Sequence, residues 1–242
     1  VLHTSETTRL ILNVGRAFRA PTLREKFLTT STCLGMYCGD VHLKPEESLN
    51  VDVGFKGIVR PLLFEVYGFN TLVDNLITAV PQAESDECDY RYTNTAEAWL
   101  LGGEARVSLL LDDLFVHGLD LKPFLSASYV WGQDHQSGEP LPKIPPFNTS
   151  AGLRLDARFD SVVRSLYLEA RMTYHGPQDR VAAHTDENGV RVEDEKRTPQ
   201  YFLFDVMAGM KIGKFWIFEG GRLNLVCENV ANAAYRDHLS ST

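Results

Sequence analysis

Aromatic and arginine side chains recur in the long polar segments of this 242-residue chain. Tyr37, Tyr90, Tyr92 and Tyr201 lie in or beside such segments, and so does Arg180. Aromatic rings stack on planar groups and cations, and a guanidinium binds anions, so these residue types suit recognition of an anionic ligand with planar groups. Packing within the loops and an aromatic girdle is an equally good interpretation of each residue taken singly.

Three of the four cysteines also lie in polar segments. Cys33 and Cys38 are in the first long segment and Cys88 is in the second, where an oxidising compartment would favour disulfides. We predict a Cys33–Cys38 bridge, whose small ring should stabilise by less than the ~3 kcal/mol expected for a loop of about 15 residues. This leaves Cys88 to pair with either of them or with a residue outside this sequence. Metal binding by Cys33 and Cys38 is a weaker alternative.

Other chemistries find little support in the sequence. It holds no Gly-x-Ser-x-Gly, His-Glu-x-x-His or phosphate-loop motif, so we expect no enzyme, no metal site and no cofactor. The formal net charge of −8 argues against a nucleic-acid partner. No run of about 18 uncharged apolar residues occurs, so no transmembrane helix is expected.

The segments between the polar loops alternate apolar and polar residues. In one of them Leu166, Leu168 and Met172 share a face, whereas Glu169 and Arg171 share the opposite face. A helix turns by about 100° per residue and gives no such alternation, so these segments are predicted to be strands. The sequence predicts nine of them, near residues 9–20, 47–57, 62–80, 94–111, 121–132, 147–159, 165–175, 201–213 and 221–229.

The connections between these strands alternate in length. Short turns and long polar loops follow each other, the turns near 57–61, 160–164 and 214–220 and the loops near 29–44, 81–92, 132–146 and 176–199. Most strands have the about 9 to 11 residues that cross a bilayer at a tilt. These patterns favour an all-β, antiparallel transmembrane β-barrel over a soluble β-sandwich. The short turns would face the periplasm and the long loops the outside.

In such a barrel the polar faces of the strands line the lumen. They carry charges of both signs, so we expect lumen-facing or plug-facing roles for Glu104, Arg106, Arg154, Asp156, Arg158, Glu169, Arg171 and Asp205.

Three short segments carry a resemblance to a known family. Residues 15–25 read Gly-Arg-Ala-Phe-Arg-Ala-Pro-Thr-Leu-Arg-Glu, residues 43–48 read Leu-Lys-Pro-Glu-Glu-Ser, and residues 228–237 read Glu-Asn-Val-Ala-Asn-Ala-Ala-Tyr-Arg-Asp. In this order and spacing they resemble the barrel of TonB-dependent receptors, which have 22 strands and a plugged lumen. The resemblance implies that residues 1–242 form a C-terminal portion of that barrel, without the plug domain and the final strand.

The resemblance also implies a function. The intact protein is expected in the bacterial outer membrane, where it would take up a scarce nutrient complex, with a ferric siderophore as the first choice. Its expected partners are the TonB complex, acting through the plug, and outer-membrane lipid and lipopolysaccharide. Haem receptors of the family carry an axial histidine where His42 stands, so a haem or cobalamin receptor is the alternative. A passive porin-type channel and a soluble β-sandwich binding module are further alternatives.

Overall fold

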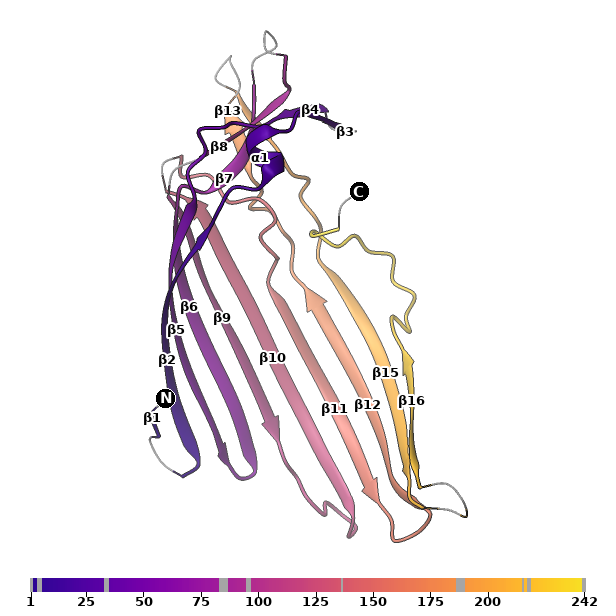
Figure 1. Cartoon of the computed structure of the whole chain (residues 1–242). Coiled ribbons are helices and arrows are strands. Elements are labelled where there is room, and N and C mark those ends of the chain that lie inside the picture. Colours follow the sequence, from indigo (N-terminus) through magenta and orange to yellow (C-terminus); the bar gives the residue numbers. More distant parts are fainter. Residues whose placement is uncertain are drawn as a thin grey trace.

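The computed structural model describes residues 2–3, 6–32, 35–82, 87–94, 97–135, 137–185, 190–214, 216 and 219–240. Within them one antiparallel sheet of ten strands forms a curved wall (Figure 1). Its strands, in order across the wall, are β1 (Leu2–His3), β2 (Thr8–Arg19), β5 (Glu46–Val59), β6 (Leu62–Asp74), β9 (Ala98–Leu109), β10 (Leu119–Asp134), β11 (Asn148–Arg158), β12 (Val163–His175), β15 (Tyr201–Ile212) and β16 (Gly221–Cys227). The nine predicted strands are thereby confirmed, and β1 adds a short edge.

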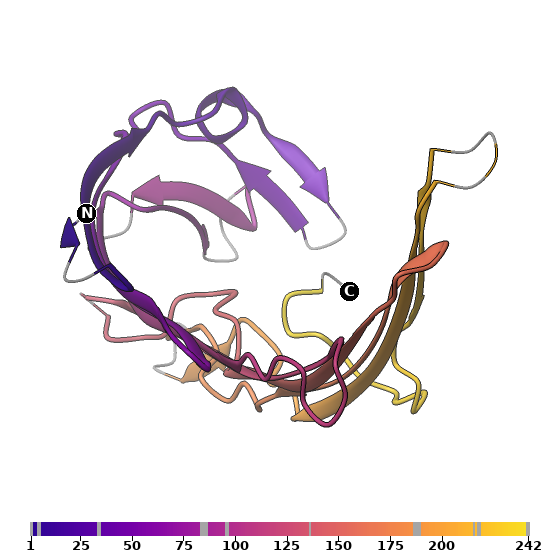
Figure 2. The same cartoon turned by 90° about the horizontal axis from the view of Figure 1, so that it is seen from below.

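The two faces of the wall differ as the alternation predicts. Apolar side chains on one face are open to the surroundings, and Leu153 and Leu168 keep 45% and 55% of their surface exposed. The charged residues between them lie on the other face, which is the concave one. Viewed along the strands, the wall is an open arc with β2 near one edge and β16 at the other (Figure 2). We call the concave side the inner face and the convex side the outer face.

Four aromatic rings on the inner face each lie over a glycine of the neighbouring strand. The register pairs Tyr67 with Gly54, Phe69 with Gly102, Phe124 with Gly152, and Tyr167 with Gly209. A Cβ added at Gly152 would overlap Cζ of Phe124, so the ring occupies the space a side chain would need. These pairs fill gaps that glycine leaves in a strand and help to fix the register.

Turns and loops separate to the two ends of the wall (Figure 1). Short turns join β5 to β6, β11 to β12 and β15 to β16 at one end, whereas the long connections gather at the other. The turn between β9 and β10 is longer, and Asp113, Phe115 and Gly118 adopt positive φ angles there. The expected alternation of turn and loop length is therefore confirmed. Among the described residues no helix has the length and apolar character to cross a bilayer.

The long loops contain structure of their own. They hold α1 (Leu23–Phe27), the small sheet of β3 (Thr30–Thr32), β4 (Gly35–Cys38), β8 (Tyr90–Asn94) and β7 (Ile77–Pro81), and the hairpin of β13 (Ala183–Thr185) and β14 (Arg191–Glu193). Two wall strands are shorter than predicted: β6 ends at Asp74 and not at 80, and β9 covers Ala98–Leu109 and not 94–111. Asn75 has a φ of 56°, which ends β6, and the chain leaves the wall there to form β7 and β8.

A small hydrophobic core lies at the long-loop end of the wall, between a loop and the inner face of the sheet. The loop after β10 turns inward, and its Leu141 and Ile144 pack against Ala98 on the inner face of β9. Buried Gln178, from the loop after β12, donates a hydrogen bond of 2.7 Å to the carbonyl of Ile144. The long loops therefore pack on the wall and on one another.

Candidate functional site: the inner wall and the long loops

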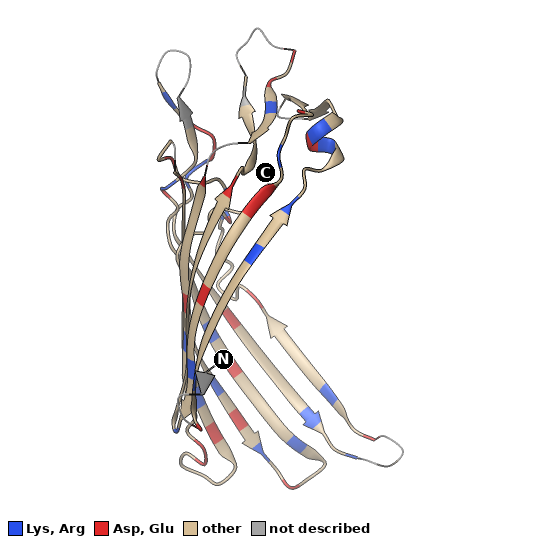
Figure 3. Cartoon of the chain, turned by 60° about the vertical axis from the view of Figure 1, so that its left-hand side comes forward, with Lys and Arg blue, Asp and Glu red and all other residues tan. Residues whose placement is uncertain are grey.

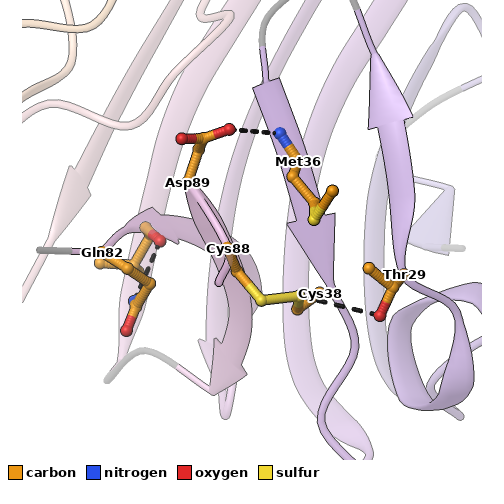
Figure 4. The surroundings of a disulfide bond; sticks show 7 residues. Thr29, Met36, Cys38, Gln82, Cys88 and Asp89 are labelled. Atoms are coloured by element: carbon orange, nitrogen blue, oxygen red, sulfur yellow. Dashed lines mark hydrogen bonds between the residues drawn. A yellow bond between two sulfur atoms is a disulfide. The ribbon is translucent and has the colours of Figure 1, made fainter. Parts of the chain in front are cut away.

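A disulfide joins the loop after β2 to the loop after β6. Cys38 and Cys88 are both buried, and their Cα atoms are 5.9 Å apart (Figure 4). Near the bond, Asp89 accepts a hydrogen bond of 2.6 Å from the backbone N–H of Met36. The predicted Cys33–Cys38 bridge is therefore wrong, because Cys38 is committed to Cys88. Cys33 itself lies outside the described residues.

The reason for this pairing is the small loop sheet. Its strands β4 and β8 run parallel, with Tyr37 opposite Tyr90 and Cys38 opposite Arg91. This arrangement brings residues 50 apart in sequence to the separation that a disulfide requires. Closeness in sequence favoured Cys33, but pairing depends on which strands become neighbours.

The same two strands bring three predicted ligand-binding tyrosines together. The rings of Tyr37 and Tyr90 are stacked, with centroids 4.7 Å apart and planes 15° apart. The ring of Tyr92 lies 6.1 Å from that of Tyr37 at a tilt of 42°. We call these three residues the tyrosine cluster. The loop sheet that carries it projects across the hollow of the arc when viewed along the wall (Figure 2).

Arg19 ties the start of the first long loop to its end. Its guanidinium donates hydrogen bonds of 2.6 and 2.7 Å to Glu46, the first residue of β5, and of 3.0 Å to both oxygens of Glu25 in α1. Thr22 caps α1, accepting from the N–H of Glu25 and donating its own N–H back to the carboxylate. Burial alone would raise the pKa of Glu25, but the hydrogen bonds from Arg19 and Thr22 outweigh it and lower the pKa.

A second aromatic group stands where β12 meets β15. The ring of Tyr201 lies between those of His175 and Tyr235, with centroids 4.4 and 4.6 Å away. The side-chain amide of Asn148 lies 3.2 Å from Nδ1 of His175. Tyr201 was a predicted ligand residue, whereas its two ring partners were not.

Charges on the inner face of β10, β11 and β12 pair within the wall. Asp156 lies 2.9 Å from both Lys122 and Arg154. Glu169, whose surface is only 7% exposed, lies 2.6 Å from Arg171 and 3.6 Å from Arg154. Bands of both signs mark these strands in Figure 3. Four of the predicted lumen-facing residues therefore neutralise one another, both within a strand and between β11 and β12.

The remaining predicted inner-face charges have different surroundings. Arg158 pairs with Asp120 at 3.0 Å, and Asp205 accepts a hydrogen bond of 2.9 Å from the backbone N–H of Asn229. Glu104 and Arg106, in contrast, have no ion-pair partner within the part of the chain that the structure describes. They line a hollow of about 360 Å³ on the inner face together with Glu65, Tyr67, Ser126, Ser128 and Asn148.

Comparison with known proteins identifies the fold. The model of the family described as "TonB dependent receptor-like, beta-barrel" matches residues 3–230. This chain belongs to the TonB-dependent receptor family. The receptor is therefore a bacterial outer-membrane protein, and the long-loop end of its wall is the extracellular end. The family consists of transport receptors and not of enzymes.

Relatives of the receptor differ in what their names say they carry. A vitamin B12 transporter, BtuB of Photobacterium profundum, is 30% identical over 115 residues, which are 46% of this chain and 18% of BtuB. The copper transporter OprC superposes with a TM-score of 0.72 at 21% identity over 97% of this chain and 33% of OprC. The FrpB iron transporter of Neisseria meningitidis gives 0.65 at 19% identity, over 99% of this chain and 35% of FrpB.

A further solved structure is the ferric enterobactin receptor PfeA of Pseudomonas aeruginosa, a Q482A mutant in complex with enterobactin. It superposes with a TM-score of 0.64 at 20% identity, over 95% of this chain and 34% of PfeA. The chain thus spans about a third of the length of these solved structures.

Two predicted ligand residues of the receptor lie apart from the aromatic groups. The guanidinium of Arg180 lies over the ring of Trp131, 4.9 Å from its centroid, and Trp131 in turn packs edge-on against Trp99. By strand alternation both tryptophans face outward, so Arg180 contacts the extracellular girdle. His42 is exposed, and its backbone N–H donates to Asp40. In the described ranges no cluster of three potential metal-ligating side chains occurs.

Several inner-wall residues of the receptor were not predicted from the sequence. Asp120, Lys122 and Phe124 alternate along β10 and face the charged rows of β11. Phe124 lies beneath the guanidinium groups of Arg106 and Arg171, at 6.0 and 5.7 Å from its ring centroid. Alternation in β10 was a usable signal for Asp120 and Lys122. Phe124 gave none, because an apolar residue on a polar face breaks the pattern.

Proposed function

We propose that the intact protein is an outer-membrane receptor that binds a scarce nutrient complex at the cell surface and imports it with energy delivered through TonB. A ferric siderophore is the first choice of ligand. The observation that carries the proposal is the tyrosine cluster, which a disulfide holds at the extracellular end of a wall with a charged inner face. Among the relatives named above, the names include an iron transporter and an enterobactin receptor.

The tyrosine cluster suits a ligand with flat, partly apolar groups. Its three rings come from two strands fixed by hydrogen bonds and by the Cys38–Cys88 bond, so little ordering is needed when a ligand arrives. Such preorganisation raises affinity because fewer side chains lose freedom on binding. The rings present π faces to planar groups and hydroxyl groups to polar ones.

The inner wall suits a plug domain, which would occupy the lumen and pass the pull of TonB to the ligand. Arg154 and Arg171 both form ion pairs with carboxylates of the wall itself. Reversing either charge would disturb the wall as well as the plug. Glu104 and Arg106 line an open hollow, so we propose that these two make the more direct contacts with the plug.

Cobalamin is the second candidate ligand. The specific observation in its favour is the 30% identity to a vitamin B12 transporter over 115 residues. Outer-membrane lipid and lipopolysaccharide complete the proposed partners, because the outer face carries the apolar band that such lipids cover.

The test is ligand-induced quenching of tryptophan fluorescence in the full-length receptor, purified in detergent. The panel is a set of ferric siderophores, haemin and cobalamin. Saturable quenching by a ferric siderophore at sub-micromolar concentration supports the first choice, whereas a response to cobalamin alone selects the second. A response to haemin alone would make His42 a ligand candidate. No response to any member contradicts the proposal for these ligand classes.

A matched pair of variants tests the tyrosine cluster. Tyr90→Ala removes the ring that stacks on Tyr37, and we expect it to weaken binding about tenfold, the equivalent of roughly 1.4 kcal/mol. Tyr129→Ala removes the same side chain from the outer face and should leave binding unchanged. Equal effects of the two changes would contradict a role for the cluster.

A further inference from the structure

The outer face carries a hollow that neither the plug nor the cargo can occupy. It lies over β11, β12, β15 and β16, which stand side by side in Figure 1. Its volume is about 440 Å³, and most of its lining is apolar outward-facing side chains, among them Leu155, Leu166, Leu168, Ala208, Met210 and Leu225. We call this hollow the outer groove.

The register explains why the groove exists. Leu155, Leu168, Ala208 and Leu225 follow one another across the four strands in a single row. Ala208 is a small residue between two leucines, so the surface drops at its position. In the next row toward the periplasm, Ala157 is likewise a small residue beside larger ones, and the surface drops there too. The floor is therefore a consequence of two alanines within a band of larger side chains.

The groove has a defined height in the membrane. On β11, β12 and β15 its lining residues belong to the periplasmic halves of the strands, and on β16 they pair with the same part of β15. Above it, the rings of Tyr174 and Phe202 pack 4.8 Å apart at the extracellular girdle. Below it, Phe159 and Trp216 are exposed in the periplasmic turns, at 44% and 81%. Aromatic residues in such positions mark the two membrane interfaces, so the groove lies at the depth of the periplasmic leaflet.

Two basic residues lie at the periplasmic end of the wall, just below the groove. Arg164 is the second residue of β12 and extends over Gly213, where an added Cβ would stand 2.7 Å from its Nε. Lys214 follows directly in the turn after β15. Neither has an ion-pair partner among the residues whose structure is described. Positive charge at the mouth of an apolar groove complements a molecule with an anionic head and a hydrocarbon tail.

We propose that the outer groove binds one acyl chain of a phospholipid in the periplasmic leaflet, with the lipid phosphate held by Arg164 and Lys214. Lipopolysaccharide is not the occupant, because it belongs to the opposite leaflet and the groove does not extend that far. The inference requires only that the protein lies in the outer membrane and is independent of the cargo. Bound lipid would fill the hollow without altering the lumen.

The test uses a photoreactive phosphatidylglycerol, with a diazirine on its acyl chain, added to the full-length receptor in lipid nanodiscs. Cross-linked peptides should concentrate in residues 155–168 and 208–225. Ala208→Leu fills the floor, and losing contact with about two methylenes should lower the cross-linking yield about tenfold. Ala151→Leu makes the same change on the outer face of β11, nearer the extracellular end, and should keep the yield. Labelling spread evenly around the wall, or equal yields in both variants, would overturn the proposal.

The headgroup is tested separately in the same assay. Arg164→Gln combined with Lys214→Gln should reduce labelling by the anionic lipid, whereas Lys143→Gln, in an extracellular loop, should not. Unchanged labelling in the double variant would remove the phosphate contact from the proposal. Sedimentation of the receptor in mild detergent checks for a second copy: a dimer that Ala208→Leu dissociates would show that another protein chain, and not lipid, covers the groove.

Discussion

Arg19 binds Glu46 through two parallel hydrogen bonds, from Nε and Nη2, at 2.6 and 2.7 Å. The two residues end β2 and begin β5, so the pair closes the base of the first long loop. They also belong to two of the three segments by which the sequence resembles its family. Each of these two segments therefore supplies one half of the ion pair, which we call the clasp.

Breaking the clasp should loosen α1 without unfolding the wall. We expect Arg19→Ala to make the peptide bonds near α1 several times more sensitive to protease, because Glu25 and Glu46 lose a shared donor. Both partners are partly exposed, so solvent limits the loss to about 1–2 kcal/mol. Arg16→Ala is the control, because Arg16, which is also in β2, forms a more exposed pair with Glu47 of β5. Equal cleavage in both variants would contradict the clasp.

Acid should release the same loop. The pKa of Glu25 is lowered in the folded state, so its contribution to stability is present above its unfolded pKa of about 4.3 and is lost as pH falls through the lower folded value. We expect protease sensitivity near α1 to rise below about pH 4. Glu25→Gln should show raised sensitivity at neutral pH and a weaker dependence on acid. An unaltered pH profile in this variant would assign the acid response to other groups.

Removing the disulfide should disperse the tyrosine cluster. In the chain-entropy account, a link between residues 50 apart contributes up to about 4 kcal/mol. We expect Cys88→Ser to lower ligand affinity strongly. The unfolding temperature of the wall should fall only slightly, because the bond lies in the loop sheet. Cys227→Ser is the control, since Cys227 is free and exposed. If binding survives loss of the bond, then the cluster does not depend on it.

Filling the space beneath Phe124 should strain the wall. Gly152→Ala places a Cβ in overlap with the ring, which must then leave its place between Arg106 and Arg171. We expect a cost of about 1–3 kcal/mol, seen as a lower unfolding temperature in detergent. Gly15→Ala is matched to it, because nothing lies within 4 Å of the added Cβ there. Similar temperatures for both variants would show that the ring moves at no cost.

The sequence predicted the wall well because alternation is a local property. The period of two places Leu166 and Glu169 on opposite faces without any knowledge of neighbouring strands. Where a strand ends is less local, and the positive φ of Asn75 divided a run that its composition left continuous.

The candidate site was less predictable, because its contacts join distant residues. The family resemblance drew attention to Tyr235, but only the fold shows that its ring packs on Tyr201. Likewise Cys88 and Cys38 meet through a parallel pair of short strands that no sequence periodicity marks. The ion pair between Arg154 and Glu169 depends on the register between β11 and β12, which alternation does not fix.

The bond between Cys38 and Cys88 makes two loops structurally dependent on each other. Segment 30–44 and segment 77–94 follow different strands of the wall, yet each supplies half of one small sheet and half of one covalent link. A graft that exchanges ligand preference between relatives must therefore carry both segments together. Transferring either segment alone would leave one cysteine without its disulfide partner and one strand without the strand it pairs with.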